Sequence, residues 1–388
     1  MEYKVIEIDD EDLNEFIRFP YSIYSEDSPW VPPLRKEYRK YITGKTSAVY
    51  SVGPSTKLMC YKGDVLTARC IVGVNEELNE AKDYHEAYIS EFESFNDKEG
   101  AKALFAYAEK WALKHGADTI KGPLALPGGD DNRGFLIDNF TDPTYVMNVY
   151  NPPYYNDLIQ EAGYEKYFDV YGFMSAMEDV NILRYQRLVP IAMKRYHFTL
   201  ENLDLNNLDK ELEDIKTVIE KALPREWADF IPPGEEEYLS IKNSIAPLCD
   251  PDLIYIARDE NRNPIGFNIT MPDYNQVLKK MKGSMNPISM LKFLYYRKKI
   301  DRARLFVLFV TPEFRNKGVT AAMYLRSHTT AMKKGYKSME GSTIWEYNEA
   351  MLRDIHAIGL TPYKTWRIYI KKLEVRRSEE RRVGKECR

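Results

Sequence analysis

The stretch 302–326 contains the residues whose types and spacing are most suggestive of chemistry. Residues 305–310 form an almost unbroken apolar run, typical of a central strand, and the pattern V-x-P-x-x-R-x-x-G follows just before a helical pattern. A glycine-containing turn that leads into a helix exposes backbone N–H groups without intrahelical partners, and such a turn can hold a phosphate or pyrophosphate. Arg315 and Lys317 add positive charge beside it. An ordinary strand–loop–helix junction with surface charges also fits the short pattern.

The full string resembles the acyl-CoA-binding motif of the GCN5-related N-acetyltransferase (GNAT) superfamily, which runs strand, V-x-P-x-x-[QR]-x-x-G-x-[GA], helix. The resemblance implies that Val310 contacts the pantetheine arm of the cofactor. It further implies a pyrophosphate-binding loop made of Arg315, Asn316, Lys317, Gly318, Val319 and Thr320. Thr320 departs from the pattern, which usually has Gly or Ala at that place. The co-substrate expected from this resemblance is acetyl-CoA or another acyl-CoA, with no metal.

A second element of the same superfamily lies downstream. Asn348 is followed eleven residues later by Gly359, which resembles N-x-x-A-x-x-L-Y-x-x-x-G-[FY]. The tyrosine that often protonates the departing thiolate in this family would fall at Ile355, so the resemblance supplies no general acid. His356 is adjacent, but neighbouring helix positions point about 100° apart, so it does not simply replace the tyrosine.

Acyl transfer from a thioester to an amine needs a neutral nucleophile, donors for the developing oxyanion and a proton for the sulfur. The resemblance places the oxyanion donor at the strand amide near Val310. The base should come from the second-half sheet or the loop at its strand end, where the available groups are Glu340, Glu346 and Tyr347. We predict Glu346 as the base and Asn348 as a further catalytic residue, since they lie two positions apart at a strand end. A plain exposed glutamate fits position 346 equally well.

Two helix–glycine–strand units occur in the same order, one in each half of the chain. Apolar residues at i, i+3, i+4 and i+7 spacing predict a helix over 99–115, which Gly116 ends before a short strand. In the second half, 321–334 is helical and Gly335 ends it before the next strand. The recurrence favours an internal duplication, although such simple units also recur by chance.

Strand hairpins precede these units in both halves, at 58–74 and 253–271. Alternating strands and helices of this kind predict an α/β (α+β) architecture of two similar domains. Residues 19–20 (FP), 30–33 (WVPP) and 150–155 (YNPPYY) add a resemblance to bacterial proteins with tandem GNAT-like halves. That resemblance implies two tandem GNAT-like domains, each a mixed central sheet flanked by helices.

We divide the chain into a GNAT-like domain at 1–178, a linker at 179–196, a GNAT domain with the acyl-CoA motif at 197–375, and a disordered or artefactual tail at 376–388. Where the first half would carry the phosphate cradle it reads FNDKEGA, whose two acidic residues would repel pyrophosphate, so this half is predicted to have lost CoA. Its insertion offers four polar residues that either bind an amine or are solvated turn residues: Asp130, Asp131, Asn132 and Arg133.

Composition sets broader limits. The 388 residues carry a net charge of -4 and are 44% hydrophobic, so neither disorder nor a general attraction to nucleic acid is expected. No window is long and apolar enough to span a membrane, and the four cysteines form no zinc or disulfide pattern. We therefore expect a cytoplasmic protein without a nucleic-acid or membrane partner. The tyrosines between 145 and 171 are expected to line the face between the halves or to fill partly exposed strand positions.

Together these observations favour a CoA-dependent N-acyltransferase that uses its C-terminal half to transfer an acyl group, acetyl in the first instance, to a small-molecule or peptide amine. The first half would shape the substrate cleft. The alternative is a non-catalytic acyl-CoA- or peptide-binding protein, which Ile355 and the degenerate first cradle favour. An aminoacyl-tRNA-dependent transferase would need a basic groove, against which the acidic balance argues.

Overall fold

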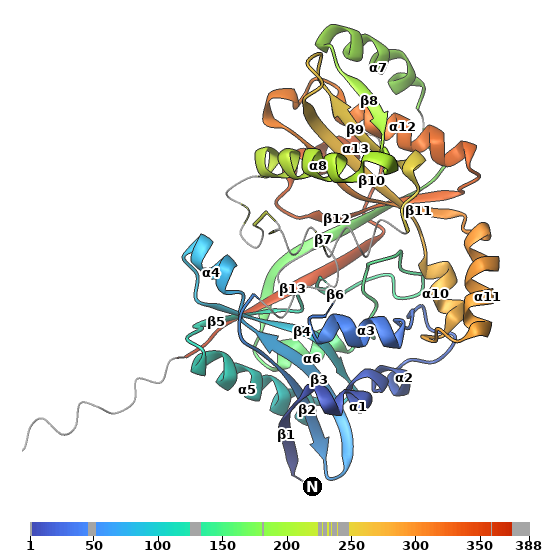
Figure 1. Ribbon diagram of the computed structural model, residues 1–388. Helices are drawn as coiled ribbons and strands as arrows, with labels where there is room; N and C mark the ends of the chain where they lie inside the picture. The colour runs from blue at the N-terminus through green and yellow to red at the C-terminus, as the bar shows by residue number, and fades with distance from the viewer. Residues whose placement is uncertain are drawn as a thin grey trace, which may run out of the picture.

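The computed structural model describes residues 2–45, 52–124, 133–180, 182–223, 227, 231–232, 234, 239, 248–357 and 359–374. The strands within these ranges form a single sheet that runs through the whole molecule, from β1 at the bottom to β8 at the top of Figure 1. Their order is β1-β2-β3-β4-β5-β13-β7-β12-β11-β10-β9-β8, with the short β6 paired to β13.

The elements of the first half are β1 (Tyr3–Ile8), α1 (Leu13–Arg18), α2 (Pro20–Ile23), α3 (Arg35–Ile42), β2 (Ser55–Lys62), β3 (Val65–Gly73), α4 (Glu76–Lys82), β4 (Glu86–Ser94), α5 (Lys98–Lys114), β5 (Thr119–Gly122), β6 (Phe135–Leu136), α6 (Tyr155–Glu161) and β7 (Glu165–Ala176). The hairpin predicted at 58–74 is β2 and β3, and the helix predicted at 99–115 is α5. Gly116, with φ 84°, follows that helix in the left-handed conformation.

The elements of the second half are α7 (Leu183–Tyr196), β8 (Thr199–Asn202), α8 (Leu208–Ala222), β9 (Ile254–Arg258), β10 (Pro264–Pro272), α10 (Asn275–Met281), α11 (Pro287–Tyr296), β11 (Arg302–Val310), α12 (Val319–Lys333), β12 (Ser338–Trp345), α13 (Glu349–Ala357) and β13 (Lys364–Lys372). Short 3-10 helices occur at Asp10–Asp12, Leu205–Asn207, Pro251–Leu253, Arg297–Lys299 and Pro312–Phe314. The strand predicted at 305–310 and the helix predicted at 321–334 are therefore present as β11 and α12.

The segment predicted as a linker, 179–196, is mostly helical, because α7 occupies its second part and packs against α12. Apolar residues of α7, among them Val189 and Met193, join the cluster formed by α12 and the end of β11. A helix with its own share of the core is not a spacer between domains. The division of the chain at 178 and 197 itself stays a prediction.

The last strands of the two halves are exchanged. β7, the last strand of the first half, lies between β13 and β12, and β13 pairs with β5 of the first half. Each half therefore completes its sheet with a strand from the other half. Parallel pairing occurs at corresponding places, between β4 and β5 and between β11 and β12, so the two halves repeat the same arrangement.

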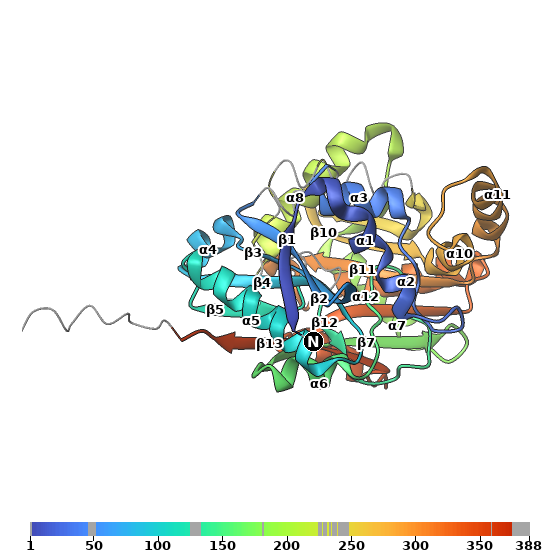
Figure 2. The ribbon, with the colours of Figure 1, turned by 90° about the horizontal axis from the view of Figure 1, so that it is seen from below.

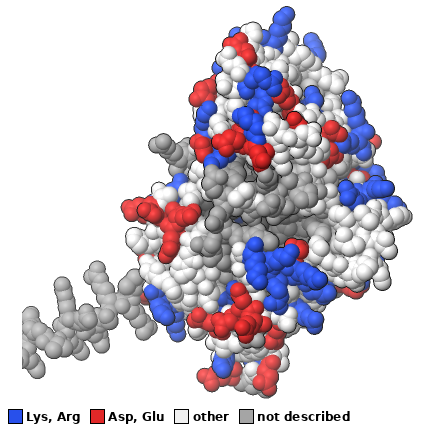
Figure 3. All heavy atoms as spheres, viewed as in Figure 1, with Lys and Arg blue, Asp and Glu red and all other residues white. Residues whose placement is uncertain are grey.

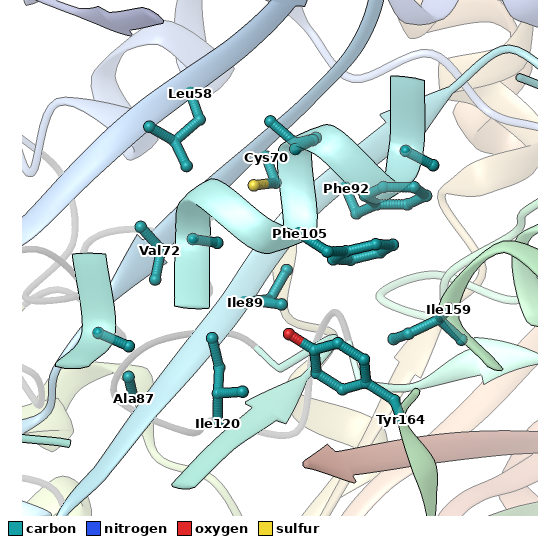
Figure 4. Close-up of a cluster of buried hydrophobic side chains, with 14 of the residues drawn as sticks. Leu58, Cys70, Val72, Ala87, Ile89, Phe92, Phe105, Ile120, Ile159 and Tyr164 are labelled. Atoms are coloured by element: carbon teal, nitrogen blue, oxygen red, sulfur yellow. The ribbon is translucent and has the colours of Figure 1, made fainter. Parts of the chain in front are cut away.

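Helices cover both faces of the sheet. Viewed from below, α1, α3 and α8 lie on one face and α5, α6 and α12 on the other (Figure 2). The first-half core lies between α5 and strands β2 to β5, where side chains such as Cys70, Ile89 and Phe105 point toward one another (Figure 4). The rings of Phe92 and Phe105 stack with centroids 4.9 Å apart. Burying each such side chain contributes about 1.5–3 kcal/mol, which holds the strands in register.

Among the described residues, no helix is long and apolar enough to cross a membrane.

Candidate functional site

Strands β11 and β12 are parallel neighbours that separate part-way along their length. Their pairing runs from Arg302 opposite Ser338 to Leu305 opposite Gly341, and the described residues show no pairing beyond that point. A cavity of about 760 Å³ occupies the space between the separated strands. The backbone of β11 beyond Leu305 thus has no partner strand on this side, and its polar groups are free to meet a ligand.

The wall of this cavity is mostly apolar. Residues of α8 and Trp227 contribute from one side, and residues of α7, α12 and α13 from the other. Aromatic rings in the wall contact one another: the ring centroid of Trp227 lies 5.0 Å from that of Trp345 and 6.3 Å from that of Phe309. A large cavity with this lining suits a ligand with a long apolar portion.

The turn after β11 brings the first residues of α12 to the cavity. A 3-10 helix at Pro312–Phe314 is followed by Asn316 with φ 59° and Gly318 with φ 85°. Both residues are in the left-handed region, which glycine adopts at no steric cost. A Cβ at Gly318 would also lie 2.8 Å from the Cβ of Ala192 on α7. The glycine is therefore required both by the backbone conformation and by the close approach of α7.

No side chain caps the N-terminus of α12. Gly318 is its N-cap residue, and within the described part of the chain the backbone N–H groups of Val319, Thr320 and Ala321 have no hydrogen-bond acceptor. Free amides at the positive end of a helix dipole favour an anion. The residues present therefore fit the pyrophosphate that the sequence motif implies.

The structure brings four of the seven predicted cofactor residues to the cavity wall: Val310, Arg315, Asn316 and Thr320. Lys317 does not line it, and its Nζ lies 4.8 Å from the ring centroid of Phe314. Val319 is buried in the core between α7 and α12. Gly318 contributes its backbone conformation. The assignment of these residues to the cofactor stays a prediction.

Arg315 ties the loop to the end of α8. Its Nη2 donates a hydrogen bond to the carbonyl oxygen of Ala222 at 2.6 Å, and its Nε donates to that of Val310 at 3.4 Å. The carbonyl groups at the end of a helix carry partial negative charge, which suits a guanidinium. In this arrangement Arg315 holds the turn in place while its side chain forms part of the cavity wall.

The corresponding helix of the first half is already capped. Asp97, in the FNDKEGA segment, precedes α5, and its Oδ1 accepts a hydrogen bond from the backbone N–H of Gly100 at 3.2 Å. The hydroxyl of Tyr3 also donates to this carboxylate, at 2.7 Å. A carboxylate therefore stands where an anion would bind at α5. This contrast favours α12 over α5 as a phosphate site.

The two predicted catalytic residues lie in different surroundings. Asn348 lines the cavity, and its Oδ1 accepts a hydrogen bond from the backbone N–H of Met351 at 3.3 Å at the start of α13. The carboxylate of Glu346 instead points toward β7, where it meets Lys166 Nζ at 2.8 Å and the backbone N–H of Asp169 at 2.9 Å. Glu346 is not among the residues of the cavity wall, so its role as a base stays a prediction.

Glu340 on β12 is a different candidate, fully buried at the centre of a polar network. Its carboxylate accepts hydrogen bonds from Ser342, Asn148 and Tyr363, the second at 2.6 Å. Burial raises the pKa of Glu340 to about 7, although the nearby Arg304 guanidinium, 3.9 Å away, opposes the shift. Ser342 also lines the cavity, so the network reaches it. The sequence offers Glu340 only as one of several available groups.

Tyr324 on α12 is a site residue that sequence reasoning missed. Its hydroxyl donates to the sulfur of Met351 at 2.9 Å, and both Tyr324 and Ile355 line the cavity. Burial raises the pKa of Tyr324, so the hydroxyl keeps its proton at neutral pH. Tyr324 therefore contacts α13, the helix in which Ile355 stands at the place of the family's tyrosine. No spacing in the sequence sets Tyr324 apart from other residues on the apolar face of its helix.

A second, smaller cavity of about 320 Å³ lies against β4 in the first half. Glu91, Glu93 and Arg69 line it, and the hydroxyls of Tyr24 and Tyr155 donate to Glu93 Oε2 at 2.8 and 2.7 Å. Burial raises the pKa of Glu93 to about 7, against the attraction of Arg69. This cavity is polar where the second-half cavity is apolar, and its carboxylates suit a positively charged group.

Some of the other predicted residues lie outside the described residues. Asp130, Asp131 and Asn132 lie outside the described residues, whereas Arg133 is buried with its guanidinium 4.5 Å from the ring centroid of Trp345. Tyr150 and Tyr155 line the first-half cavity, and the expectation that the tyrosines of 145–171 line the face between the halves stays a prediction. The described residues contain no group of three or more His, Cys, Asp or Glu that could hold a metal ion.

Solved structures with a similar fold include a tandem GNAT protein and another GCN5-related N-acetyltransferase. A tandem GNAT protein from the clavulanic acid biosynthesis pathway matches 96% of this chain and 99% of its own, with a TM-score of 0.56 and 12% identity. A GCN5-related N-acetyltransferase from Sphaerobacter thermophilus matches 96% of each chain, with a TM-score of 0.52 and 12% identity. The predicted fold class, two tandem GNAT-like halves of mixed α/β structure, is confirmed.

Sequence relatives are distant but span most of the chain. "Protein YghO" of Escherichia coli (strain K12) is 25% identical over 369 residues, which cover 93% of each chain. "Bacterial ceramide synthase" of Caulobacter vibrioides (strain NA1000 / CB15N) is 24% identical over 373 residues, which cover 93% of this chain and 95% of the relative. No protein-family profile matches the sequence.

Proposed function

We propose that this chain, which has the tandem GNAT fold, is an acyl-CoA-dependent N-acyltransferase whose donor binds in the second half. One observation carries the proposal: the uncapped N-terminus of α12 adjoins a large apolar cavity between the separated strands β11 and β12. A pyrophosphate needs the first feature and an acyl-pantetheine arm needs the second. The first half offers neither, because Asp97 caps its helix and its cavity is small and polar.

The donor would lie with its pyrophosphate on the amides of Val319 and Thr320 and its arm along β11. The backbone of β11 beyond Leu305 has no partner strand on this side, so its N–H groups are available to the arm and to the thioester oxygen. Thr320 stands where the family motif usually has Gly or Ala, and its side chain lines the cavity. Its hydroxyl can donate to the phosphate as well as occupy space.

We extend the proposal to the acyl chain and the acceptor. The apolar wall exceeds what an acetyl group needs, so an acyl chain longer than acetyl is the better match. The relative named a bacterial ceramide synthase supports an amine that is itself part of a lipid. We therefore propose a long-chain acyl-CoA as donor and the primary amine of a lipid-like base as acceptor, with acetyl-CoA and soluble amines as poorer substrates.

The chemistry requires one proton to leave the amine and one to reach the sulfur. The amine nitrogen attacks the carbonyl carbon of the thioester, the C–S bond breaks, and the products are an amide and CoA thiol. Glu340, with a pKa of about 7, would receive the amine proton through the hydroxyl of Ser342. Tyr324 would donate its proton to the leaving sulfur and regain it from solvent or from the base.

The test is a release assay for CoA thiol. Purified chain is given acyl-CoA donors of increasing length, each with a panel of amines that includes a long-chain amino alcohol. The proposal expects the highest kcat/KM with a long-chain donor and the lipid-like amine, and a large loss of kcat in Glu340→Gln. Donor binding without thiol release across the whole panel would favour a non-catalytic acyl-CoA-binding protein instead.

A further inference from the structure

Helix α11 presents apolar side chains to solvent. Ile288 is 67% exposed, Leu291 68%, Leu294 52% and Tyr295 56%. Their spacing of three and four residues places them on one side of the helix. A surface helix normally turns this stripe toward the core, so an exposed one indicates a surface that binds something.

The orientation of α11 is fixed by its other side. The ring of Phe293 stacks on that of Tyr274 with centroids 6.1 Å apart, and Ser289 is buried. Phe293 and Tyr296 pack against the cluster that contains Val277 and Met281 of α10. Because this inner side is occupied, rotating the helix would expose Phe293 and Tyr296, which now pack against α10. The outward stripe is thus a stable feature of the fold.

Positive charge surrounds the stripe. Between Asn275 and Ile300 the sequence has no acidic residue and seven basic ones, in a chain whose net charge is -4. Six of these seven are exposed: Lys280, Lys282, Lys292, Arg297, Lys298 and Lys299. Figure 3 shows Lys and Arg at the right-hand edge of the molecule, beside uncharged surface in the region of α10 and α11.

Neighbouring acidic groups neutralise little of this charge. Glu26 pairs with Lys282 at 2.7 Å, and both side chains are exposed. Lys299 Nζ meets the hydroxyl of Tyr295 at 2.5 Å, a neutral partner that leaves the positive charge in place. The surface formed by the exposed residues of α11 and these basic residues, here the α11 surface, therefore combines an apolar stripe with a cationic border.

We propose that the α11 surface docks on an anionic lipid bilayer. The apolar side chains enter the boundary between headgroups and acyl chains, while the lysines and arginines contact the lipid phosphates. Short amphipathic helices with basic borders bind membranes in this way, by buried apolar area plus attraction to anionic lipid. With ten residues, α11 lies on the surface and does not span it. The docking does not depend on acyl transfer, but it would place the enzyme where a lipid-like amine is dissolved.

The near-neutral charge of the whole chain predicted no membrane partner, because a sum over 388 residues hides one local cluster. Charge and exposure together favour a bilayer over a protein partner. Six exposed basic residues lie on or directly beside α10 and α11, as binding to an anionic surface requires.

Co-sedimentation with lipid vesicles tests the proposal on the full-length chain. Vesicles of phosphatidylcholine alone are compared with vesicles that contain about a third phosphatidylglycerol. We expect binding to the second kind only, and at least about a tenfold weaker partition when the salt concentration is raised, since salt screens the attraction between the basic residues and the anionic headgroups.

Three variants identify the surface that binds. Leu291→Asp and the pair Lys298→Glu, Lys299→Glu should each lower the partition coefficient at least about tenfold. Leu183→Asp changes an equally exposed leucine on α7, which is 67% exposed, and should leave binding unchanged. Unchanged melting temperatures show that the variants are folded. Failure of the wild type to bind anionic vesicles, or equal binding by Leu291→Asp, would overturn the proposal.

Sedimentation velocity without lipid supplies the remaining check. The proposal expects a monomer, in which the α11 surface is free. A dimer that Leu291→Asp dissociates would show instead that the stripe binds a second copy of the chain, and it would overturn the proposal. Because donor binding and thiol release are measured without vesicles, the failure of this proposal and the failure of the proposed enzyme activity are separate results.

Discussion

Replacing Glu340 by glutamine should remove a large part of the pH dependence of stability. The pKa of Glu340 is raised from 4.5 to about 7 in the folded chain, chiefly because the carboxylate is buried. In the unfolded chain this group ionises near its ordinary value, while in the folded chain it keeps its proton until about pH 7. Its contribution to stability is therefore fully present below pH 4.5 and is lost as pH rises to 7.

The magnitude follows from the size of the shift. A displacement from 4.5 to about 7, at about 1.4 kcal/mol for each pKa unit, corresponds to roughly 3 kcal/mol. Glu93 and Asp273, with pKa values raised by burial to about 7 and about 6, titrate over the same range. The difference between wild type and Glu340→Gln therefore reports the contribution of Glu340 together with its interaction with the Asp273 charge.

The assay is urea unfolding of wild type and Glu340→Gln at intervals from pH 4 to pH 8. The free energy of unfolding of the wild type relative to the variant should fall by about 3 kcal/mol across that range. Glu260→Gln, which changes an exposed glutamate, serves as the control and should show no such trend. A constant difference between wild type and Glu340→Gln at all pH values would refute the reasoning, because Glu340 would then titrate alike in both states.

Three further predictions concern the second-half cavity. Gly318→Ala should lower the free energy of unfolding in urea by about 1 kcal/mol more than Gly335→Ala does. Both glycines have positive φ, but only at Gly318 would the added Cβ meet a neighbour, at 2.8 Å. Tyr324→Phe should lower kcat for thiol release by roughly 10²-fold with donor affinity unchanged, whereas an equal loss in Tyr185→Phe would argue against a specific role. Leu308→Trp, which fills the cavity, should shift the ratio of kcat/KM values toward shorter acyl-CoA donors by about tenfold, and an unchanged chain-length profile would place the acyl chain elsewhere.

Local patterns in the sequence were sufficient to predict most helices and strands. Period-3.6 spacing identified α5 and α12, and the apolar run at 305–310 identified β11, because each of these elements buries one face or both within its own half. The left-handed turn residue Gly318 was also predictable, since a motif with glycine before a helix has few other conformations.

The exchange of β7 and β13 could not be predicted in the same way. Strand pairing between residues about 200 positions apart leaves no mark on local periodicity, and both strands have the same pattern whichever half they join. The helix α7 within the predicted linker at 179–196 was not predicted, for a related reason. α7 has the exposed Pro190 inside it, which weakens its helical pattern, and the apolar residues Val189 and Met193 pack against α12.

The candidate site likewise has a part that the local sequence predicted and a part that it did not. The turn before α12 follows from a contiguous motif, and four of the seven residues predicted there line the cavity, while their role in binding an anion stays a prediction. Glu340 and Tyr324 contact distant residues, Asn148, 192 positions away in the chain, and Met351, so nothing in the local sequence marks them. Glu346 had the position expected of a base in the sequence, but its carboxylate points to Lys166 on the neighbouring strand. Strand alternation decides this direction, and a shift of one residue reverses it.

The central claim is that the second half alone binds an acyl-CoA, and calorimetric titration of a CoA thioester tests it most directly. Wild type and Asp97→Asn, whose change lies at the capped helix of the first half, should bind one equivalent with similar affinity. Thr320→Glu places a carboxylate at the start of α12, where the helix dipole favours it, so the fold should persist. The carboxylate should repel the pyrophosphate and weaken binding of the CoA thioester at least about tenfold. Equal binding by wild type and Thr320→Glu, or a loss of binding in Asp97→Asn, would contradict the account.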